Sequence, residues 1–147
     1  MIIEQLAIGF VMLLLTVVVH AVGIDILIRL SPRLRDPISQ KFKHSWQVIM
    51  TSIIVMGIYG IHIIVIWMWA GLYLVYECAP IASLSDALYF SISSYTTLGL
   101  GDIILSESCR ILSGVEAANG FILFGWTTAF IFAVVNGLYK REEKQLE

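Results

Sequence analysis

Three long apolar segments divide this chain. Stretches without a formal charge cover residues 5–24, 45–76 and 117–139, and contain 20, 32 and 23 residues. A helix of about 20 apolar residues crosses the roughly 30 Å hydrocarbon core of a bilayer. The pattern therefore predicts three transmembrane helices. The second is longer than a bilayer requires, so we expect it to tilt or to extend beyond the headgroups.

A fourth, shorter apolar segment lies between the second and third predicted spans. Residues 84–95 would form a helix of about 18 Å, which is too short to cross the membrane. Such a helix can only enter the bilayer and come back to the same side. The return segment, residues 97–101, would then expose backbone carbonyls at membrane depth, where they are tolerated only if buried in protein or lining a polar path. A re-entrant helix followed by a carbonyl-lined segment is the architecture of an ion selectivity filter.

Basic residues predict the orientation in the membrane. We expect an additional N-terminal transmembrane helix over residues 1–30, a basic loop over residues 31–44 and a basic tail over residues 140–147. By the positive-inside rule both basic segments should be cytoplasmic. The N-terminus and the return segment would then lie outside, and the C-terminus inside. The basic residues are Arg29, Arg33, Arg35, Lys41 and Lys43 near the loop, and Lys140, Arg141 and Lys144 in the tail.

Composition narrows the function classes. Hydrophobic residues make up 59% of the chain and charged residues 14%, against about 25% charged residues in a typical soluble domain. The net charge of −2 argues against nucleic-acid binding. The sequence has no nucleophile with a paired base, no metal-ligand cluster and no nucleotide-binding glycine loop, so we expect neither enzymatic activity nor a cofactor. The expected fold class is an all-α membrane protein.

Residues 97–102 read Thr-Leu-Gly-Leu-Gly-Asp. With the apolar segments around them, they resemble the pore domain of potassium channels, whose usual filter reads Thr-x-Gly-Tyr-Gly-Asp. The resemblance covers residues 55–136. It implies a pore domain with an outer helix at 45–76, a pore helix at 84–95, a filter at 97–101 and an inner helix at 111–139. A homotetramer in the lipid bilayer is expected, because one chain supplies one loop and a closed carbonyl cage needs four.

The resemblance implies that the filter binds dehydrated potassium ions as they permeate. The ligands would be the carbonyl oxygens of Thr97, Leu98, Gly99 and Leu100, with the hydroxyl of Thr97. Gly99 and Gly101 suit this role because successive carbonyls can point the same way only if alternate residues adopt dihedrals that glycine reaches at little cost. Asp102 could anchor the return segment from behind and raise the local cation concentration.

Several positions depart from the family pattern. Leu100 replaces the usual tyrosine and cannot hydrogen-bond to the pore helix, although leucine also occurs in the second pore loop of some tandem-pore potassium channels. Where the family often has two adjacent tryptophans in the pore helix, this chain has Tyr89 and Phe90. Ser93 stands in place of an acidic residue that is common behind the filter, and Tyr95 stands where the family usually has a small residue. We interpret Tyr89, Ser93 and Asp102 as filter support. Three alternatives stay open: a potassium-selective channel, a weakly selective monovalent cation channel and a non-conducting membrane interaction protein.

A stripe of residues at four-residue spacing marks one face of the third predicted span. Its members are Gly120, Phe124, Thr128, Phe132 and Asn136. The resemblance implies that Phe124, Thr128 and Phe132 line a cavity below the filter and that Gly120 is a hinge. The alternative is that the stripe packs against the second span, where glycine and threonine admit close helix contact.

Five further residues could titrate or form a disulfide. His20 and His62 lie within predicted spans, where they could sense pH, but neutral histidines bonded to a neighbouring helix are favoured. Cys78 and Cys109 flank the return segment on the predicted outer side. An oxidising exterior permits a disulfide, and free, partly buried thiols are the slightly favoured alternative. Glu116 is expected near the back of the filter or in the outer headgroup layer.

Overall fold

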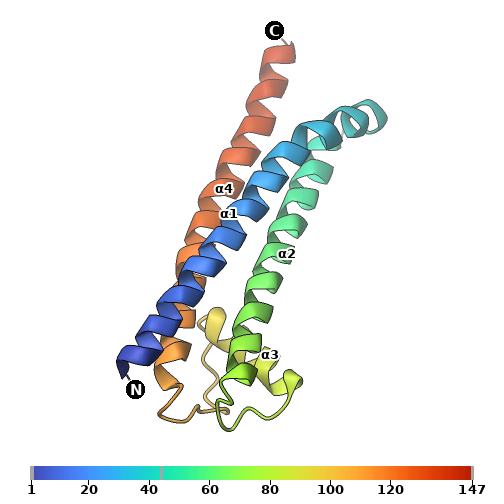
Figure 1. The fold of residues 1–147 in the computed structure, drawn as a ribbon. Coiled ribbons are helices and arrows are strands. Elements are labelled where there is room, and N and C mark those ends of the chain that lie inside the picture. The colour runs from blue at the N-terminus through green and yellow to red at the C-terminus, as the bar shows by residue number, and fades with distance from the viewer. Residues whose placement is uncertain (1, 44, 147) are drawn as a thin grey trace.

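The computed structural model describes residues 2–43 and 45–146. They form four helices and no strand: α1 (Ile2–Lys41), α2 (Trp46–Val75), α3 (Leu84–Tyr95) and α4 (Arg110–Leu146). Helices α1, α2 and α4 build an elongated bundle, and α3 packs at the end that also holds the N-terminus (Figure 1). Residue 147 of the predicted tail lies outside the described residues.

Three helices are long and apolar enough to cross a membrane. They are Ile2–Lys41, Trp46–Val75 and Arg110–Tyr139. The predictions of three spans and of an all-helical membrane protein are therefore confirmed at this level. Much of the outer surface of the bundle is apolar, as on α1, where Phe10, Leu14 and Val18 are exposed. Such a surface suits a lipid environment, because lipid tails are as apolar as the side chains that meet them.

Helix α3 has the bounds predicted for the short apolar segment. The hydroxyl of Ser83, which precedes the helix, accepts a hydrogen bond of 3.0 Å from the backbone N–H of Asp86 and donates one of 2.7 Å to its carboxylate. A serine cap and an acid in the first turn both stabilise a helix N-terminus. The other end is reached at Tyr95, after which the N–H of Thr96 bonds back to Ile92.

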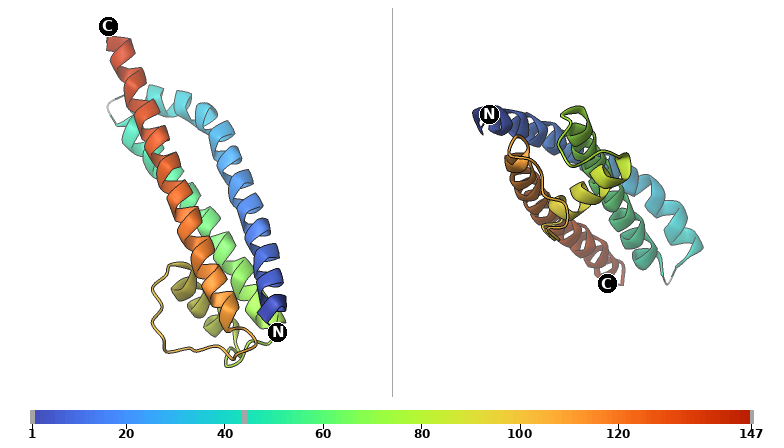
Figure 2. Two further views of the ribbon diagram at one scale, coloured as in Figure 1. Left: turned by 90° about the vertical axis from the view of Figure 1, so that its left-hand side faces the viewer. Right: turned by 90° about the horizontal axis from the view of Figure 1, so that it is seen from below.

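The prediction of a loop over residues 31–44 was wrong for most of that segment. Helix α1 continues to Lys41 and contains both Pro32 and Pro37. Each proline lacks a backbone N–H and favours a bend, and α1 turns away from the bundle near this end (Figure 2). Leu34 and Ile38 still pack on an apolar cluster of α2 and α4, so tertiary packing keeps the segment helical.

The main core lies where α3 meets α2 and α4. Its fully buried side chains include Trp69, Tyr73, Tyr95, Leu112 and Leu123. A second, smaller cluster of Met50, Ile54, Ile58 and Leu138 joins α2 and α4 at the opposite end of the bundle. Helix α3 is thus held by the larger and better buried of the two clusters.

Candidate functional site

The backbone of the return segment alternates in conformation. Thr97, Gly99 and Gly101 have φ angles of 59°, 57° and 78°, in the left-handed region that glycine reaches at little cost. Gly99 and Gly101 adopt the kind of dihedral angles that the sequence predicted for them. The positive φ of Thr97 was not foreseen, since a β-branched residue rarely adopts it. The side chains of Leu98 and Leu100, between them, are exposed.

The last turn of α3 holds the start of the return segment. The carbonyl oxygen of Ser93 accepts hydrogen bonds from the N–H groups of Leu98 at 2.9 Å and Gly99 at 3.1 Å. The hydroxyl of Ser93 accepts another from Leu100 at 3.2 Å. Ser93 thus binds three successive backbone amides of this segment.

The far end of the return segment is tied to α3 by a side-chain pair. The Tyr89 hydroxyl donates a hydrogen bond of 2.6 Å to the carboxylate of Asp102. The other Asp102 oxygen accepts from the N–H of Ile103 at 3.1 Å. The bond from Tyr89 stabilises the charged carboxylate and lowers the pKa of Asp102. Both ends of the segment are therefore fastened to the same short helix.

Glu116 lies behind α3, fully buried. Its carboxylate accepts a hydrogen bond of 2.6 Å from the Tyr73 hydroxyl of α2 and another from the Ser91 hydroxyl of α3. This decides between its two expected positions in favour of the one at the back of the return segment. Tyr73 and Ser91 were missed as partners. The clue was Glu116 itself, because an acid inside a membrane domain needs hydrogen-bond donors.

A second buried polar group joins all four helices. His62 of α2 lies between the Tyr95 hydroxyl of α3, at 2.7 Å from Nδ1, and the Thr127 hydroxyl of α4, at 2.9 Å from Nε2. The same Thr127 hydroxyl is 3.2 Å from Nε2 of His20 in α1. The interpretation of both histidines as hydrogen-bonded to neighbouring helices agrees with these contacts.

Cys78 and Cys109 are joined by a disulfide, so the favoured alternative of free thiols was wrong. Their Cα atoms are 5.8 Å apart although 31 positions separate them in sequence. The hydrogen bond of 2.8 Å from Ser106 N–H to the Ala79 carbonyl runs beside the bridge. The disulfide and this hydrogen bond therefore join the two ends of the segment that contains α3 and the return segment. The spacing of the two cysteines in the sequence does not by itself reveal that these ends are close together.

The stripe predicted on α4 divides between two environments. Gly120 is buried against Tyr95, and the ring of Phe124 contacts those of His62 and Tyr95 at centroid distances of 4.7 and 5.3 Å. Thr128 and Phe132 are exposed on the surface of the single chain. This exposure differs from the burial that packing of this half of the stripe against α2 would produce.

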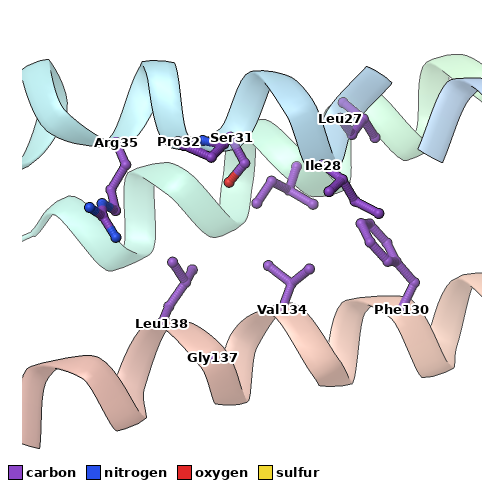
Figure 3. A pocket seen from close by; sticks show the side chains of 10 residues that line it. Leu27, Ile28, Ser31, Pro32, Arg35, Phe130, Val134, Gly137 and Leu138 are labelled. Carbon is purple, nitrogen blue, oxygen red and sulfur yellow. The ribbon is translucent and has the colours of Figure 1, made fainter. Parts of the chain in front are cut away.

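An apolar cavity of about 230 Å³ lies at the opposite end of the bundle. Figure 3 shows side chains of α4, among them Phe130, Val134 and Leu138, pointing across it toward Leu27 and Ile28 of α1. Its lining includes no residue of α3 or the return segment. We therefore treat it as separate from the candidate site.

A protein-family model described as an ion channel matches residues 61–136, just over half of the chain. The chain belongs to this ion channel family. The match begins within α2 and ends within α4, so it contains α3 and the return segment but leaves out α1. It agrees with the resemblance to potassium channel pore domains. No curated protein and no solved structure matches the chain.

Proposed function

We propose that four copies of this chain form a potassium-selective channel that conducts passively through the return segment. The observation that carries the proposal is the alternating positive φ at Thr97, Gly99 and Gly101 in a member of an ion channel family. Four such segments around an axis would form a cage of backbone carbonyls, the arrangement that replaces the hydration shell of a potassium ion. The chain is not expected to be an enzyme.

In this proposal the filter runs from residue 97 to residue 101. The carbonyl oxygens of Thr97, Leu98, Gly99 and Leu100, with the Thr97 hydroxyl, bind the permeant ion. Phe124, Thr128 and Phe132 line the cavity on the inner side, and the exposure of Thr128 and Phe132 on the single chain supports that position. Several ions occupy the filter together, and repulsion between them lets each one leave.

The orientation follows from charge. The basic residues of the α1 end and of the tail would face the cytoplasm, with the N-terminus and the filter outside. Helix α3 would then be re-entrant, since its 12 residues are too few to span. The acids Glu77, Asp86, Asp102 and Glu107 would surround the outer mouth with one base, Arg110. A surplus of acids at a pore mouth concentrates cations.

Selectivity depends on holding the filter geometry without the usual tyrosine. Leu100 has no hydroxyl to bind α3, but Ser93 binds the backbone N–H of Leu100 instead, and Tyr89 holds Asp102 just beyond the filter. These two contacts would replace the missing support. They favour strict potassium selectivity over the weakly selective alternative.

The test is ion flux into liposomes that contain the purified protein, with potassium and sodium compared. Gly99→Ala places a Cβ at a φ of +57°, which costs roughly 1–2 kcal/mol and disturbs the filter locally. Gly60→Ala is the matched control, because a Cβ there meets open space within a helix. Potassium flux should exceed sodium flux, vanish in Gly99→Ala and persist in Gly60→Ala.

Each alternative gives another result. Equal potassium and sodium fluxes would show a weakly selective cation channel on the same scaffold. A closed gate is distinguished from a dead pore by thermal unfolding, because ions that bind the filter stabilise the tetramer even when nothing flows. Neither flux nor potassium-dependent stabilisation would indicate a non-conducting interaction protein. In that case Gly99→Ala should leave any cellular phenotype unchanged.

A further inference from the structure

Helix α1 lies outside the matched pore region, yet half of its buried face is polar. Its six buried residues are Gln5, Gly9, Met12, Thr16, His20 and Ile24. A helix that only packs from the lipid side needs no polar group there, because burying one without a partner is costly. The three polar residues must therefore be explained by what they contact.

Two of these polar residues attach α1 to α4 near the filter end of the bundle. Gln5 donates a hydrogen bond of 3.0 Å to the Glu107 carbonyl and accepts one of 3.1 Å from the N–H of Ile111. Thr16 accepts a hydrogen bond of 2.7 Å from the Asn119 amide. These contacts dock the helix, but none of them reaches α3.

The third polar residue, His20, begins a chain of hydrogen bonds that does reach α3. The chain passes from His20 to Thr127, then to His62, and ends at the hydroxyl of Tyr95, over distances of 3.2, 2.9 and 2.7 Å. All four residues are buried, three of them inside the predicted spans and the fourth at the end of α3. Each comes from a different helix, so the chain couples α1 to the pore helix through both α2 and α4.

The hydrogen positions in this chain follow from the groups present. If Tyr95 donates to Nδ1 of His62, the Nε2–H of His62 donates to Thr127, whose hydroxyl then donates to Nε2 of His20. Every hydroxyl hydrogen then has an acceptor. Of the side-chain polar atoms of His20, Thr127, His62 and Tyr95, Nδ1 of His20 is then the one without a partner among the described residues. The reverse order would also leave the Tyr95 hydrogen unbonded, so the first order is favoured.

The chain of hydrogen bonds ends at Tyr95, the residue that positions the start of the filter. Tyr95 closes α3, two positions before Thr97. Its hydroxyl is held by His62 and its ring contacts Phe124, while its backbone carbonyl lies against Gly120. A displacement of Tyr95 would move the first filter ligand. Binding sites of this kind need their supporting groups fixed within about 0.5 Å.

We propose that α1 is part of the filter support. In this proposal His20, Thr127 and His62 are positioning residues that hold Tyr95, and through it the inner end of the filter at Thr97. The inference rests on the proposed channel function. It extends that function by making ion selectivity depend on a helix that lies outside residues 61–136, the region that matches the ion channel family.

The test compares variants that remove one hydroxyl each. Tyr95→Phe and Thr127→Val keep most of the side-chain shape, and Thr16→Val is the control because it removes a different hydrogen bond between the same helices, α1 and α4. We expect the potassium-over-sodium permeability ratio to fall about fivefold in each of the two chain variants, the factor that corresponds to one neutral hydrogen bond. The double variant should fall no further, because the chain acts as a unit. Thr16→Val should destabilise the tetramer without changing the ratio.

A second pair of variants tests α1 directly. In His20→Gln the side-chain amide oxygen can accept from Thr127, whereas His20→Leu has no acceptor. The potassium-over-sodium permeability ratio should be kept in His20→Gln and lowered in His20→Leu. This pair also decides the question if Tyr95→Phe fails to assemble into tetramers.

Three outcomes would overturn the inference. One is a wild-type permeability ratio in assembled Tyr95→Phe and Thr127→Val channels, and another is an equal ratio in His20→Gln and His20→Leu. The third is an equal loss in Thr16→Val, which would show that helix docking in general sets the ratio. Failure of the channel proposal looks different, because the wild-type protein itself would then show neither potassium flux nor potassium-dependent stabilisation, and the inference would fall with it.

Discussion

The backbone carbonyl of Tyr95 lies so close to Gly120 that a Cβ added at residue 120 would overlap the carbonyl oxygen. Helix α4 runs through this position without interruption. The glycine is therefore needed for the close approach of α3 to α4, whether or not α4 also bends there. Its role as a hinge stays a prediction.

Gly120→Ala should destabilise the protein and impair conduction. The atom that the new methyl group meets belongs to the backbone and cannot swing away, so either α3 or α4 must move. Overpacking of this kind costs about 1–3 kcal/mol. Thermal unfolding of the protein and, for the proposed channel function, potassium flux are the measurements. Gly125→Ala is the control, since a Cβ at residue 125 has open space. Equal behaviour of the two variants would contradict the close contact.

Glu116 should tolerate glutamine far better than alanine. Glutamine retains an acceptor for one of the two hydroxyls of Tyr73 and Ser91, and the other hydroxyl can rotate to accept from the new amide. Alanine leaves the Tyr73 hydroxyl unsatisfied beside a cavity, and the Ser91 hydroxyl keeps the Ile66 carbonyl, at 3.0 Å, as its acceptor. We expect a cost of about 1 kcal/mol for Glu116→Gln and about 3 kcal/mol or more for Glu116→Ala, measured by unfolding. Equal costs would mean that the carboxylate does not hold these groups.

The disulfide between Cys78 and Cys109 should stabilise the protein by about 2–4 kcal/mol, because it closes the segment that carries α3. The chain contains two cysteines. A thiol reagent should therefore label none in the oxidised, unfolded protein and both after reduction. Cys78→Ser with Cys109→Ser should lower the unfolding temperature as much as the reductant does. Labelling without reduction would show free thiols instead.

Local patterns in the sequence predicted those parts of the site that depend on local physics. The apolar segment at residues 84–95 has the bounds of α3, and Gly99 and Gly101 mark positive φ angles because other residues avoid them. Contacts between segments that are distant in the sequence are not indicated by any local pattern. The pairing of His62 with Tyr95 joins residues 33 positions apart. Nothing in the neighbourhood of either one identifies the other.

The same distinction explains the two corrections. Basic side chains suggested a loop over residues 31–44, but Leu34 and Ile38 pack on α2 and α4, a contact that depends on helix placement. The disulfide required Cys78 and Cys109 to meet across the whole segment that contains α3 and residues 97–101. Both features arise only after the helices have assembled.

The hydrogen bond from Tyr89 to Asp102 gives a prediction for acid. This bond lowers the pKa of Asp102, so the carboxylate stays charged, and keeps its hydrogen bonds, down to a pH below the ordinary value of about 3.9 for aspartate. Its contribution to holding the return segment is present above that value and is lost as the pH falls through the lowered pKa. In Tyr89→Phe the pKa should return toward its ordinary value. The external pH at which potassium flux falls to half should therefore be higher in this variant than in the wild type.

Tyr59→Phe, on the exposed face of α2, is the control, and its potassium flux should depend on pH as that of the wild type does. Asp102→Asn should abolish this acid response altogether. An unchanged midpoint in Tyr89→Phe would show that the hydrogen bond does not govern the charge of Asp102.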